Sequence, residues 1–455
     1  MTSTLPGQQA GAAGLPPGEP AAPDATPLLV PREGVPPVVE SGAALAEVVA
    51  RLGAGTGPVA VDAERASGYR YSQRAYLVQL RRAGAGTALI DPVACPDLSS
   101  LSEALDGVEW VLHAASQDLG CLAEVGLVPA AVFDTELGAR LAGFERVGLG
   151  AMVENMLGLR LEKGHSAADW STRPLPADWL VYAALDVEVL VELRDAIEAE
   201  LAGQGKLAWA HEEFEAVRLA PPPPPRVDPW RRTSGMHRLR TRRQLAGVRA
   251  LWEVRDGIAR ARDTAPGRIL PDAAIVSAVA AGPSSASELL ALPVFGGRAT
   301  RRHVDTWFAA LAAAAALPDS ALPQPVPTGD GYPPPNRWAE RDPVAAKRLA
   351  RVRTVVTTLA EQLSMPPENL VQPDAVRRLA WQPPPLPDDV AAVREALRSS
   401  GVRSWQVDLV ADWLAGALAD PPPGGQAIEA PRPGPAAPAP PFSDPGVAPA
   451  RPLPG

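Results

Sequence analysis

The sequence predicts one α/β domain followed by two all-helical domains, with disordered proline-rich segments at both ends. Strand and helix patterns alternate in the first half of the chain, whereas only helical spacing of apolar residues is found after residue 225. Two proline-rich stretches, at 221–225 and 317–336, divide the chain into three parts. Proline supplies 53 of the 455 residues. Because it interrupts helices and sheets, this excess belongs in linkers and tails.

The composition is that of a globular protein with sizeable cores. Hydrophobic residues make up 46% and charged residues 21%, and the net charge of −9 does not by itself indicate a nucleic-acid partner. The two cysteines, Cys95 and Cys121, are too few for a disulfide framework or a zinc cluster and fit a reducing cytosol. The first residues lack a signal-peptide pattern, and the longest apolar run, at 307–317, is too short to span a bilayer. We therefore expect a cytoplasmic protein with no membrane partner.

The proline-rich stretches also set the expected domain boundaries. Both ends of the chain are rich in proline, glycine and alanine and cannot bury enough surface to become ordered. The alternative is a single domain with long surface loops, but a continuous core rarely tolerates two such tracts. The expected order is a disordered segment at 1–36, the α/β domain at 37–219, a linker at 220–237, a helical domain at 238–316, a linker at 317–336, a second helical domain at 337–419 and a disordered tail at 420–455.

Short-range patterns predict the elements of the α/β domain. Runs of β-branched and aromatic residues indicate strands, and apolar residues three and four apart indicate helices. Ser116 is the expected N-cap of a helix that ends at Gly126. The predicted strands are 58–64, 75–82, 87–92 and 109–115, and the predicted helices are 98–107, 116–126 and a long amphipathic one at 176–205.

Four carboxylates and a tyrosine form the candidate site. Asp62 and Glu64 stand two apart on a strand, so both side chains point to one face and can converge on a cation. Asp118 follows a strand-to-helix turn, and Tyr182 and Asp186 lie four apart on one face of a helix. Each pattern alone is more often an ordinary set of surface charges. Together they favour a site for Mg²⁺ or Mn²⁺, which prefer oxygen ligands.

At these residues the sequence resembles ribonuclease D, a family of the DEDD exonuclease superfamily with a tyrosine in its third motif. The segments VAVDAE (59–64), VLHAASQDLGCL (111–122) and WLVYAALDVEVL (179–190) are similar to the three exonuclease motifs of that family. The stretch at 168–187 is similar to its Asp-Trp-Ser-x-Arg-Pro-Leu pattern. The resemblance covers most of the predicted α/β domain.

The resemblance implies a ribonuclease H-like fold and the removal of nucleotides from the 3′ end of RNA as 5′-monophosphates. It also implies that four acids hold two divalent metal ions, and that the substrates are precursors of tRNA and other stable RNA. The metal ligands that it assigns are Asp62, Glu64, Asp118 and Asp186. Arg65 departs from the family pattern, which more often has an aromatic residue at this position.

The chemistry of the residue types agrees with this implication. Two cations about 4 Å apart can activate a water molecule and stabilise the departing 3′ oxygen in an in-line displacement. Tyr182 is expected to orient that water by a hydrogen bond. Whether it also accepts a proton is open, because a free phenol has a pKa of about 10.

Several nearby residues have structural as well as functional interpretations. Trp170 and Arg173 are expected over the mouth of the site, where they would stack on a base and contact a phosphate, but packing in the core is an equally good interpretation. His113 ends a strand and is expected to be a structural hydrogen-bonding residue. Asp134 is expected to cap a helix.

An arginine-rich stretch opens the first helical domain. Residues 226–263 contain eleven arginines against four acids. This charge pattern is typical of a polyanion-binding surface and equally typical of a solvated helix face. We predict RNA contacts from this stretch, with Arg238, Arg240, Arg242 and Arg243 as the candidates.

The helical domains carry a second resemblance. The segments at 269–280 and 291–297 are similar to the helicase-and-RNase-D C-terminal (HRDC) domain. The region 337–419 looks like a diverged second copy, in which PENLVQP (367–373) stands in the place of GRILPDA. This resemblance implies an auxiliary RNA-binding role.

Two other functions are alternatives to a metal-dependent exoribonuclease. A non-catalytic RNA-binding scaffold on a decayed nuclease fold would be expected to have lost at least one metal ligand, whereas this sequence keeps the complete acidic set and Tyr182. A DNA-directed 3′–5′ exonuclease is the second alternative. The family resemblance and the paired helical domains argue against it.

Overall fold

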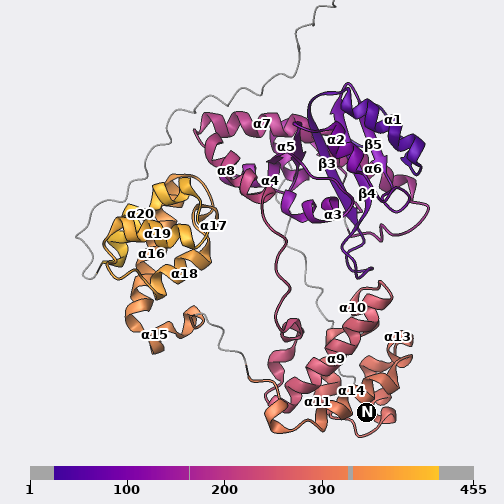
Figure 1. The fold of residues 1–455 in the computed structure, drawn as a ribbon, viewed down its shortest axis with the longest axis vertical. Helices are drawn as coiled ribbons and strands as arrows, with labels where there is room; N and C mark the ends of the chain where they lie inside the picture. Colours follow the sequence, from indigo (N-terminus) through magenta and orange to yellow (C-terminus); the bar gives the residue numbers. More distant parts are fainter. Residues whose placement is uncertain (1–24, 163, 166, 326–331, 420–455) are drawn as a thin grey trace, which may run out of the picture.

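The computed structural model describes residues 25–162, 164–165, 167–325 and 332–419. Within these residues one mixed α/β domain is followed by two helical domains, so the fold class predicted from the sequence is confirmed (Figure 1). The predicted tail at 420–455 and most of the predicted N-terminal segment lie outside the described residues.

A six-stranded mixed sheet forms the centre of the α/β domain. Its strand β3 runs antiparallel to β4 and parallel to β6, and β7 extends the parallel side. The order across the sheet is β2 (Val38–Val39), β5 (Gly86–Ile90), β4 (Ala75–Ala83), β3 (Thr56–Arg65), β6 (Glu109–Leu112) and β7 (Ala131–Asp134). Strand β3 therefore has hydrogen-bonded partners on both sides, which fixes the side chains that it carries.

Side chains along β3 alternate between the two faces of the sheet. Ala60 packs on one face of the sheet, toward the helices α6 (Ala177–Glu188) and α7 (Leu190–Gly203). Because the side-chain period of a strand is two, Asp62 and Glu64 lie on that same face. The other face carries the core beneath α1 (Gly42–Gly53), α2 (Ser99–Ala104) and α3 (Leu119–Ala123), to which β3 contributes Val59, Val61 and Ala63.

The long helix predicted at 176–205 is in fact two helices, α6 and α7, which meet at Val189. A straight helix of that length would extend about 45 Å, whereas six strands span only about 24 Å. The buried Val189 ends α6 and begins α7, so both helices can lie against the sheet. The remaining helices of the domain are α4 (Thr135–Ala142), α5 (Leu149–Leu157) and α8 (Leu207–Arg218).

Residues 25–36 belong to the folded domain, so the predicted disordered segment at 1–36 is too long. Strand β1 (Thr26–Leu28) pairs in parallel with β8 (Leu159–Leu161). Arg32 forms an ion pair with Glu192 on α7. These partners lie more than a hundred residues away in the sequence, and a proline-rich stretch carries no local signal of them.

The two helical domains repeat one order of elements. A helix of 20 residues, α9 or α16, is followed by a helix of 4 residues, α10 or α17, and then by a helix that opens next to a Pro-Asp pair. This order agrees with the predicted diverged second copy. The helices of the first domain are α9 (Arg242–Ala261), α10 (Pro266–Ile269), α11 (Asp272–Ala281), α12 (Ala286–Ala291), α13 (Arg298–Arg301) and α14 (Val304–Ala315). Those of the second are α15 (Trp338–Arg341), α16 (Pro343–Gln362), α17 (Pro367–Leu370), α18 (Pro373–Trp381), α19 (Val390–Ser399) and α20 (Ser404–Leu418).

Part of the predicted linker at 220–237 is folded onto the first helical domain. The short 3₁₀ helix Pro229–Arg232 places the buried Trp230 in that domain's core, together with residues of α9 and α11. Residues 221–227 are exposed and have no regular structure. In the part of the chain that the structure describes, we find no helix with the length and apolar character needed to cross a membrane.

The second helical domain shares a hydrophobic core with the α/β domain. The rings of Trp209 on α8 and Trp405 on α20 are stacked with centroids 5.0 Å apart, and Nε1 of Trp405 donates to Glu213 at 3.0 Å. Nζ of Lys206 donates to the carbonyls of Leu141 at 2.8 Å and Ser364 at 3.3 Å. These contacts join the two domains, so a truncated α/β domain would expose residues that are now covered.

Candidate active site

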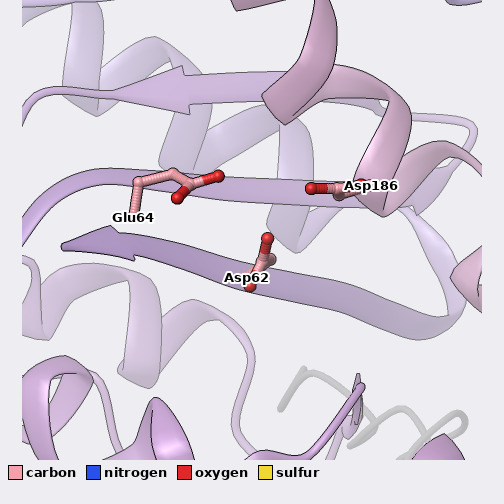
Figure 2. Close-up of side chains that lie close together, drawn as sticks. All are labelled: Asp62, Glu64 and Asp186. Atoms are coloured by element: carbon pink, nitrogen blue, oxygen red, sulfur yellow. The ribbon is translucent and has the colours of Figure 1, made fainter. Parts of the chain in front are cut away.

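Three of the predicted acids converge at the end of β3. Asp62 and Glu64 project from β3 and Asp186 projects from α6, which crosses the same face of the sheet (Figure 2). One carboxylate oxygen from each lies within 4.8 Å of the other two. Asp62 and Asp186 are partly exposed, whereas Glu64 is buried. Solutes can therefore reach one side of the cluster.

Asp118, the fourth predicted acid, approaches the site from the turn after β6. It is buried and forms an ion pair with Arg65, whose Nη2 lies 3.4 Å from Oδ1 of Asp118. A register shift between Glu64 and Arg65 interrupts the pairing of β3 with β4. Asp118 is thus not part of the cluster of three and has a cationic side chain as its partner.

The turn that carries Asp118 differs from the predicted one. Ser116 is not the N-cap of a long helix, because a 3₁₀ turn at Ala115–Gln117 precedes α3. The carboxylate of Asp134 caps α4, as predicted, and also accepts hydrogen bonds from the backbone N–H groups of Ala114 at 3.0 Å and Ala115 at 2.9 Å. Asp134 is therefore a positioning residue for Asp118, and local sequence shows only its capping role.

The site gathers four acids beside a single positive charge, that of Arg65. Burial, followed by repulsion from Asp62, Asp186 and Asp118, raises the pKa of Glu64 to about 10. Burial and repulsion from Asp62 raise the pKa of Asp118 to about 8. Burial also raises the pKa values of Asp62 and Asp186. The positive charge of Arg65 opposes the shifts at Asp62, Glu64 and Asp118 but does not abolish them.

Tyr182 lies on the same face of α6 as Asp186. Burial, followed by the charges of Asp186, Glu64 and Asp62, raises the pKa of the Tyr182 phenol. Its hydrogen bond to Asp186 opposes, without abolishing, the upward shift in the pKa of that acid. In this state the phenol keeps its proton, so it can donate a hydrogen bond but does not act as a base.

Aromatic residues hold the ring of Tyr182 in place. Its centroid lies 5.9 Å from that of His165, in a T-shaped arrangement, and 6.4 Å from that of Trp170. Trp170 is fully buried and its Nε1 donates to the carbonyl of His165 at 3.2 Å. The prediction that Trp170 stacks on a base is therefore wrong, and the alternative of core packing is what the structure shows.

Arg173 has structural partners within the domain, so the structure gives no support to its predicted phosphate contact. Its Nε and Nη2 donate to the two oxygens of Asp91 at 2.7 and 2.8 Å. Its other N–H groups donate to the carbonyls of Tyr76, Trp170 and Thr172, each at 2.8 Å. All five donors of the guanidinium are thus used within the domain. No local pattern indicates Asp91, which lies 82 residues away.

The four arginines predicted to contact RNA lie just before α9 or in its first turn, and two of them have internal partners. Arg243 donates to the carbonyl of Ala315, the last residue of α14, and Arg242 donates to that of Leu322 beyond it. Arg238 and Arg240 are exposed, and their RNA contacts stay a prediction. The helix α9 is 20 residues long, so its start is about 30 Å from its other end.

His113 has the structural role that the sequence predicted. Its Nδ1 lies 2.9 Å from the hydroxyl of Thr135 in a hydrogen bond. Burial lowers the pKa of His113 to about 4, so the ring is neutral at physiological pH.

Known protein families match each of the three folded domains. A 3′–5′ exonuclease family matches residues 37–202, the HRDC domain family matches residues 244–311, and a family described as a 3′ to 5′ exonuclease C-terminal domain matches residues 331–418. The last match overlaps the region predicted to be a second HRDC-like copy.

Curated relatives identify the family. A ribonuclease D from Acidiphilium cryptum is 34% identical over 315 residues, a stretch that covers 66% of this chain and 77% of that protein. The chain belongs to the ribonuclease D family. Ribonuclease D from Escherichia coli K12 is 33% identical over 278 residues, which cover 59% of this chain and 72% of that protein. The resemblance stated from the sequence is thereby confirmed.

Solved structures show that the similarity extends over the helical domains. A protein from Bifidobacterium adolescentis is 38% identical with a TM-score of 0.79, and the match covers 87% of this chain and 99% of that one. Escherichia coli ribonuclease D, described as an exoribonuclease involved in structured RNA processing, has a TM-score of 0.61 at 28% identity and covers 85% of this chain and 99% of its own. As a ribonuclease D family member, the chain is a hydrolytic 3′–5′ exoribonuclease.

The donor set fits the divalent cations on which a ribonuclease D exonuclease domain depends. Carboxylate oxygens are hard ligands of the kind that Mg²⁺ and Mn²⁺ prefer. The pKa values of Glu64 and Asp118 are raised because these acids are buried beside other acids and Arg65 offsets only part of the repulsion. Divalent cations at Asp62, Glu64 and Asp186 would supply that charge.

The stabilisation that Mg²⁺ gives to folding should increase with pH. The folded protein without metal binds more protons than the unfolded chain above about pH 4, because Glu64 and Asp118 have raised pKa values. Its free energy of unfolding should therefore fall as the pH rises toward 8 to 10, while Mg²⁺, which binds the ionised acids, reverses this loss. We expect the difference in Tm between saturating Mg²⁺ and EDTA to grow steadily from about pH 6 to about pH 9.

The matched control is Asp186→Asn, which should lose most of this metal-dependent gain in Tm. A difference in Tm that is the same at every pH would contradict the link between metal binding and the shifted acids.

Proposed function

We propose that this protein removes nucleotides one at a time from the 3′ end of RNA with two divalent metal ions, Mg²⁺ or Mn²⁺, and releases 5′-nucleoside monophosphates. The convergence of Asp62, Glu64 and Asp186 within 4.8 Å is the observation that carries this proposal. As substrates we propose tRNA precursors and other small stable RNA. The free, buried thiols of Cys95 and Cys121 agree with a cytoplasmic location.

The four acids divide between two elements and a turn. We assign Asp62, Glu64 and Asp186 to one cation, and Asp118 together with Asp62 to the second. When bound, such ions activate a water molecule and stabilise the departing 3′ oxygen. For Asp118 to serve as a ligand, the ion pair with Arg65 has to open. The freed guanidinium then lies next to the place where the scissile phosphate is bound.

Tyr182 is assigned to the attacking water. Its phenol is kept protonated by the acids around it, so it supports water by donating a hydrogen bond. The ring is positioned by Trp170 and His165, which are therefore positioning residues. The raised pKa of the phenol supports the orienting role predicted from the sequence. It gives no support to proton acceptance by Tyr182 in the metal-free state.

The domain boundaries that we propose extend the catalytic domain to 25–219 and the first helical domain to 229–316, and keep the second helical domain at 337–419. Family matches at 37–202, 244–311 and 331–418 support this division into three domains. Both helical domains are assigned an auxiliary role in holding RNA.

Product analysis tests the reaction. A single-stranded RNA with a 5′ label should be shortened in steps of one nucleotide in the presence of Mg²⁺ or Mn²⁺ and left intact with EDTA, and the released products should be 5′-monophosphates. Asp186→Asn should lower turnover by several orders of magnitude, because one metal ligand is lost, while RNA binding in EDTA is retained. Asp106→Asn, an exposed acid of the α/β domain outside the cluster, is the matched control.

Comparable hydrolysis by Asp186→Asn and the unchanged chain at equal Mg²⁺ would contradict the metal assignment. Equal rates on a DNA strand of the same sequence would favour the DNA-directed alternative.

A substitution of Tyr182 separates water orientation from metal binding. Tyr182→Phe removes the hydroxyl but keeps the ring that packs against His165 and Trp170. We expect kcat to fall by roughly 10²- to 10³-fold, while the Mg²⁺ concentration that gives half of the maximal rate stays nearly unchanged. Metal titrations of the rate measure both quantities. Full turnover at saturating Mg²⁺ with a much higher metal requirement would show that the hydroxyl acts on the metal and not on the water.

A further inference from the structure

The end of α9 is docked on the loop that connects β3 to β4, residues 66–74. The backbone N–H of Ala265 donates to the carbonyl of Tyr69 at 2.9 Å. Nε of Arg268 donates to the carbonyl of Gly68 at 2.8 Å. In Figure 1 the helices α9 and α10 reach up toward the α/β domain at this point. The first helical domain is therefore attached by side-chain and backbone contacts as well as by its linker.

Asp263 is the centre of this contact. Its Oδ1 accepts hydrogen bonds from the backbone N–H groups of Tyr71 at 3.1 Å and Ser72 at 2.8 Å. Its Oδ2 accepts one from the hydroxyl of Tyr76 at 3.3 Å. Burial opposes ionisation of Asp263, but the hydrogen bonds from Ser72 and Tyr76 outweigh it and lower the pKa. The carboxylate thus holds three donors of the α/β domain at physiological pH.

Five arginines gather on the two sides of this contact, and we call them the arginine seam. They are Arg70 and Arg74 of the β3–β4 loop and Arg260, Arg262 and Arg268 of the first helical domain. Of these, Arg70 is partly buried and the other four are exposed, Arg260 with 70% of its side chain. The positive charge of the seam therefore faces solvent.

Tyrosine rings alternate with these guanidinium groups. Arg268 lies over the ring of Tyr69 at 4.1 Å, and Arg260 lies over the ring of Tyr71 at 5.6 Å. Surfaces that bind single-stranded nucleic acid combine backbone-tracking positive charge with aromatic and arginine faces on which bases stack. The composition of the seam matches that requirement.

The acids that border the seam are already engaged. Asp263 is bound to the β3–β4 loop, as described above. Asp256 accepts from the hydroxyl of Tyr71 at 3.0 Å and from Arg260 at 3.0 Å. Two acids against five arginines leave an excess of positive charge, which complements a phosphate backbone.

The seam is continuous with the active site. The β3–β4 loop begins just after Glu64. Nε of Arg70 donates to Oγ of Ser171 at 2.8 Å, and Ser171 directly follows Trp170, whose ring packs beside that of Tyr182. The same loop therefore borders both a metal ligand and the residues that position the tyrosine.

We propose that the arginine seam binds the single-stranded RNA segment just upstream of the 3′-terminal nucleotide and guides it into the active site. The inference rests on the proposed function and identifies a binding surface for it. Asp263 acts as a positioning residue, because it brings Arg260, Arg262 and Arg268 to the rim of the site. The arginines at the start of α9, which the sequence favoured, are about 30 Å from this rim and would meet only RNA that extends well beyond the site.

Binding in EDTA tests the seam without hydrolysis. The full chain carrying Arg74→Gln, Arg260→Gln and Arg262→Gln loses the contact of Arg260 with Tyr71. It keeps the hydrogen bonds of Arg268 and Asp263 that hold the docking. With a fluorescent single-stranded RNA as the probe, we expect the Kd to rise by roughly 10-fold or more and the slope of log Kd against log salt to fall by about 2, at about 0.7 per lost phosphate contact.

The control removes the same charge from another surface. Lys347→Gln, Arg353→Gln and Arg398→Gln are exposed positions of the second helical domain, whose proposed auxiliary role concerns longer RNA. With a short single strand as the probe in both variants, this control should leave the Kd within about twofold and the salt slope nearly unchanged. Equal losses in both triple variants, or an unchanged salt slope in the seam variant, would overturn the proposal. Because no turnover is needed, this result stands whether or not the proposed reaction is correct.

Asp263→Asn tests the positioning role. The substitution removes a negative charge, so a purely electrostatic effect would strengthen RNA binding. Loss of docking predicts the opposite, a Kd several-fold higher and a higher KM on long single strands, with kcat on a dinucleotide unchanged because a dinucleotide does not reach the seam. Tighter or equal RNA binding by Asp263→Asn would overturn this role.

Discussion

Repulsion among four carboxylates is the constraint that the α/β domain has to satisfy. Strand β3 carries Asp62 and Glu64, and their pairing with Gln79 and Leu77 of β4 prevents the two acids from moving apart. Helix α6 then brings Asp186 onto the same face, and Asp134 fixes the turn before Asp118. Bringing these acids together lowers the free energy of unfolding, and cations that bind there offset part of this loss.

Arg65 changes how this site behaves without metal. Its ion pair with Asp118 supplies one positive charge inside the site, where the family more often has an aromatic residue. The metal-free site therefore consists of a cluster of three acids, Asp62, Glu64 and Asp186, and a fourth acid, Asp118, which is paired with Arg65. In the two-metal centre that we propose, binding of the second cation at Asp118 would release Arg65 from this ion pair.

The sequence was informative wherever the chemistry depends on local periodicity. The period of two along β3 and the spacing of four between Tyr182 and Asp186 predicted which side chains share a face, and the joint pattern with the resemblance to ribonuclease D predicted that they form one site. The sequence was silent where a partner lies far away in the chain. Trp170 and Arg173 were predicted at the mouth of the site, but Asp91, 82 residues from Arg173, engages its guanidinium. The docking of Asp263 onto Tyr71 joins residues 192 apart, and no local pattern indicates it.

Anomalous X-ray scattering from crystals of the full chain soaked with Mn²⁺ is the most direct test of the metal centre. We predict two peaks, one bounded by Asp62, Glu64 and Asp186 and the other by Asp118, with the guanidinium of Arg65 moved away from Asp118. Peaks only at other acids, or no peak while Asp118 stays paired with Arg65, would contradict the proposed two-metal centre.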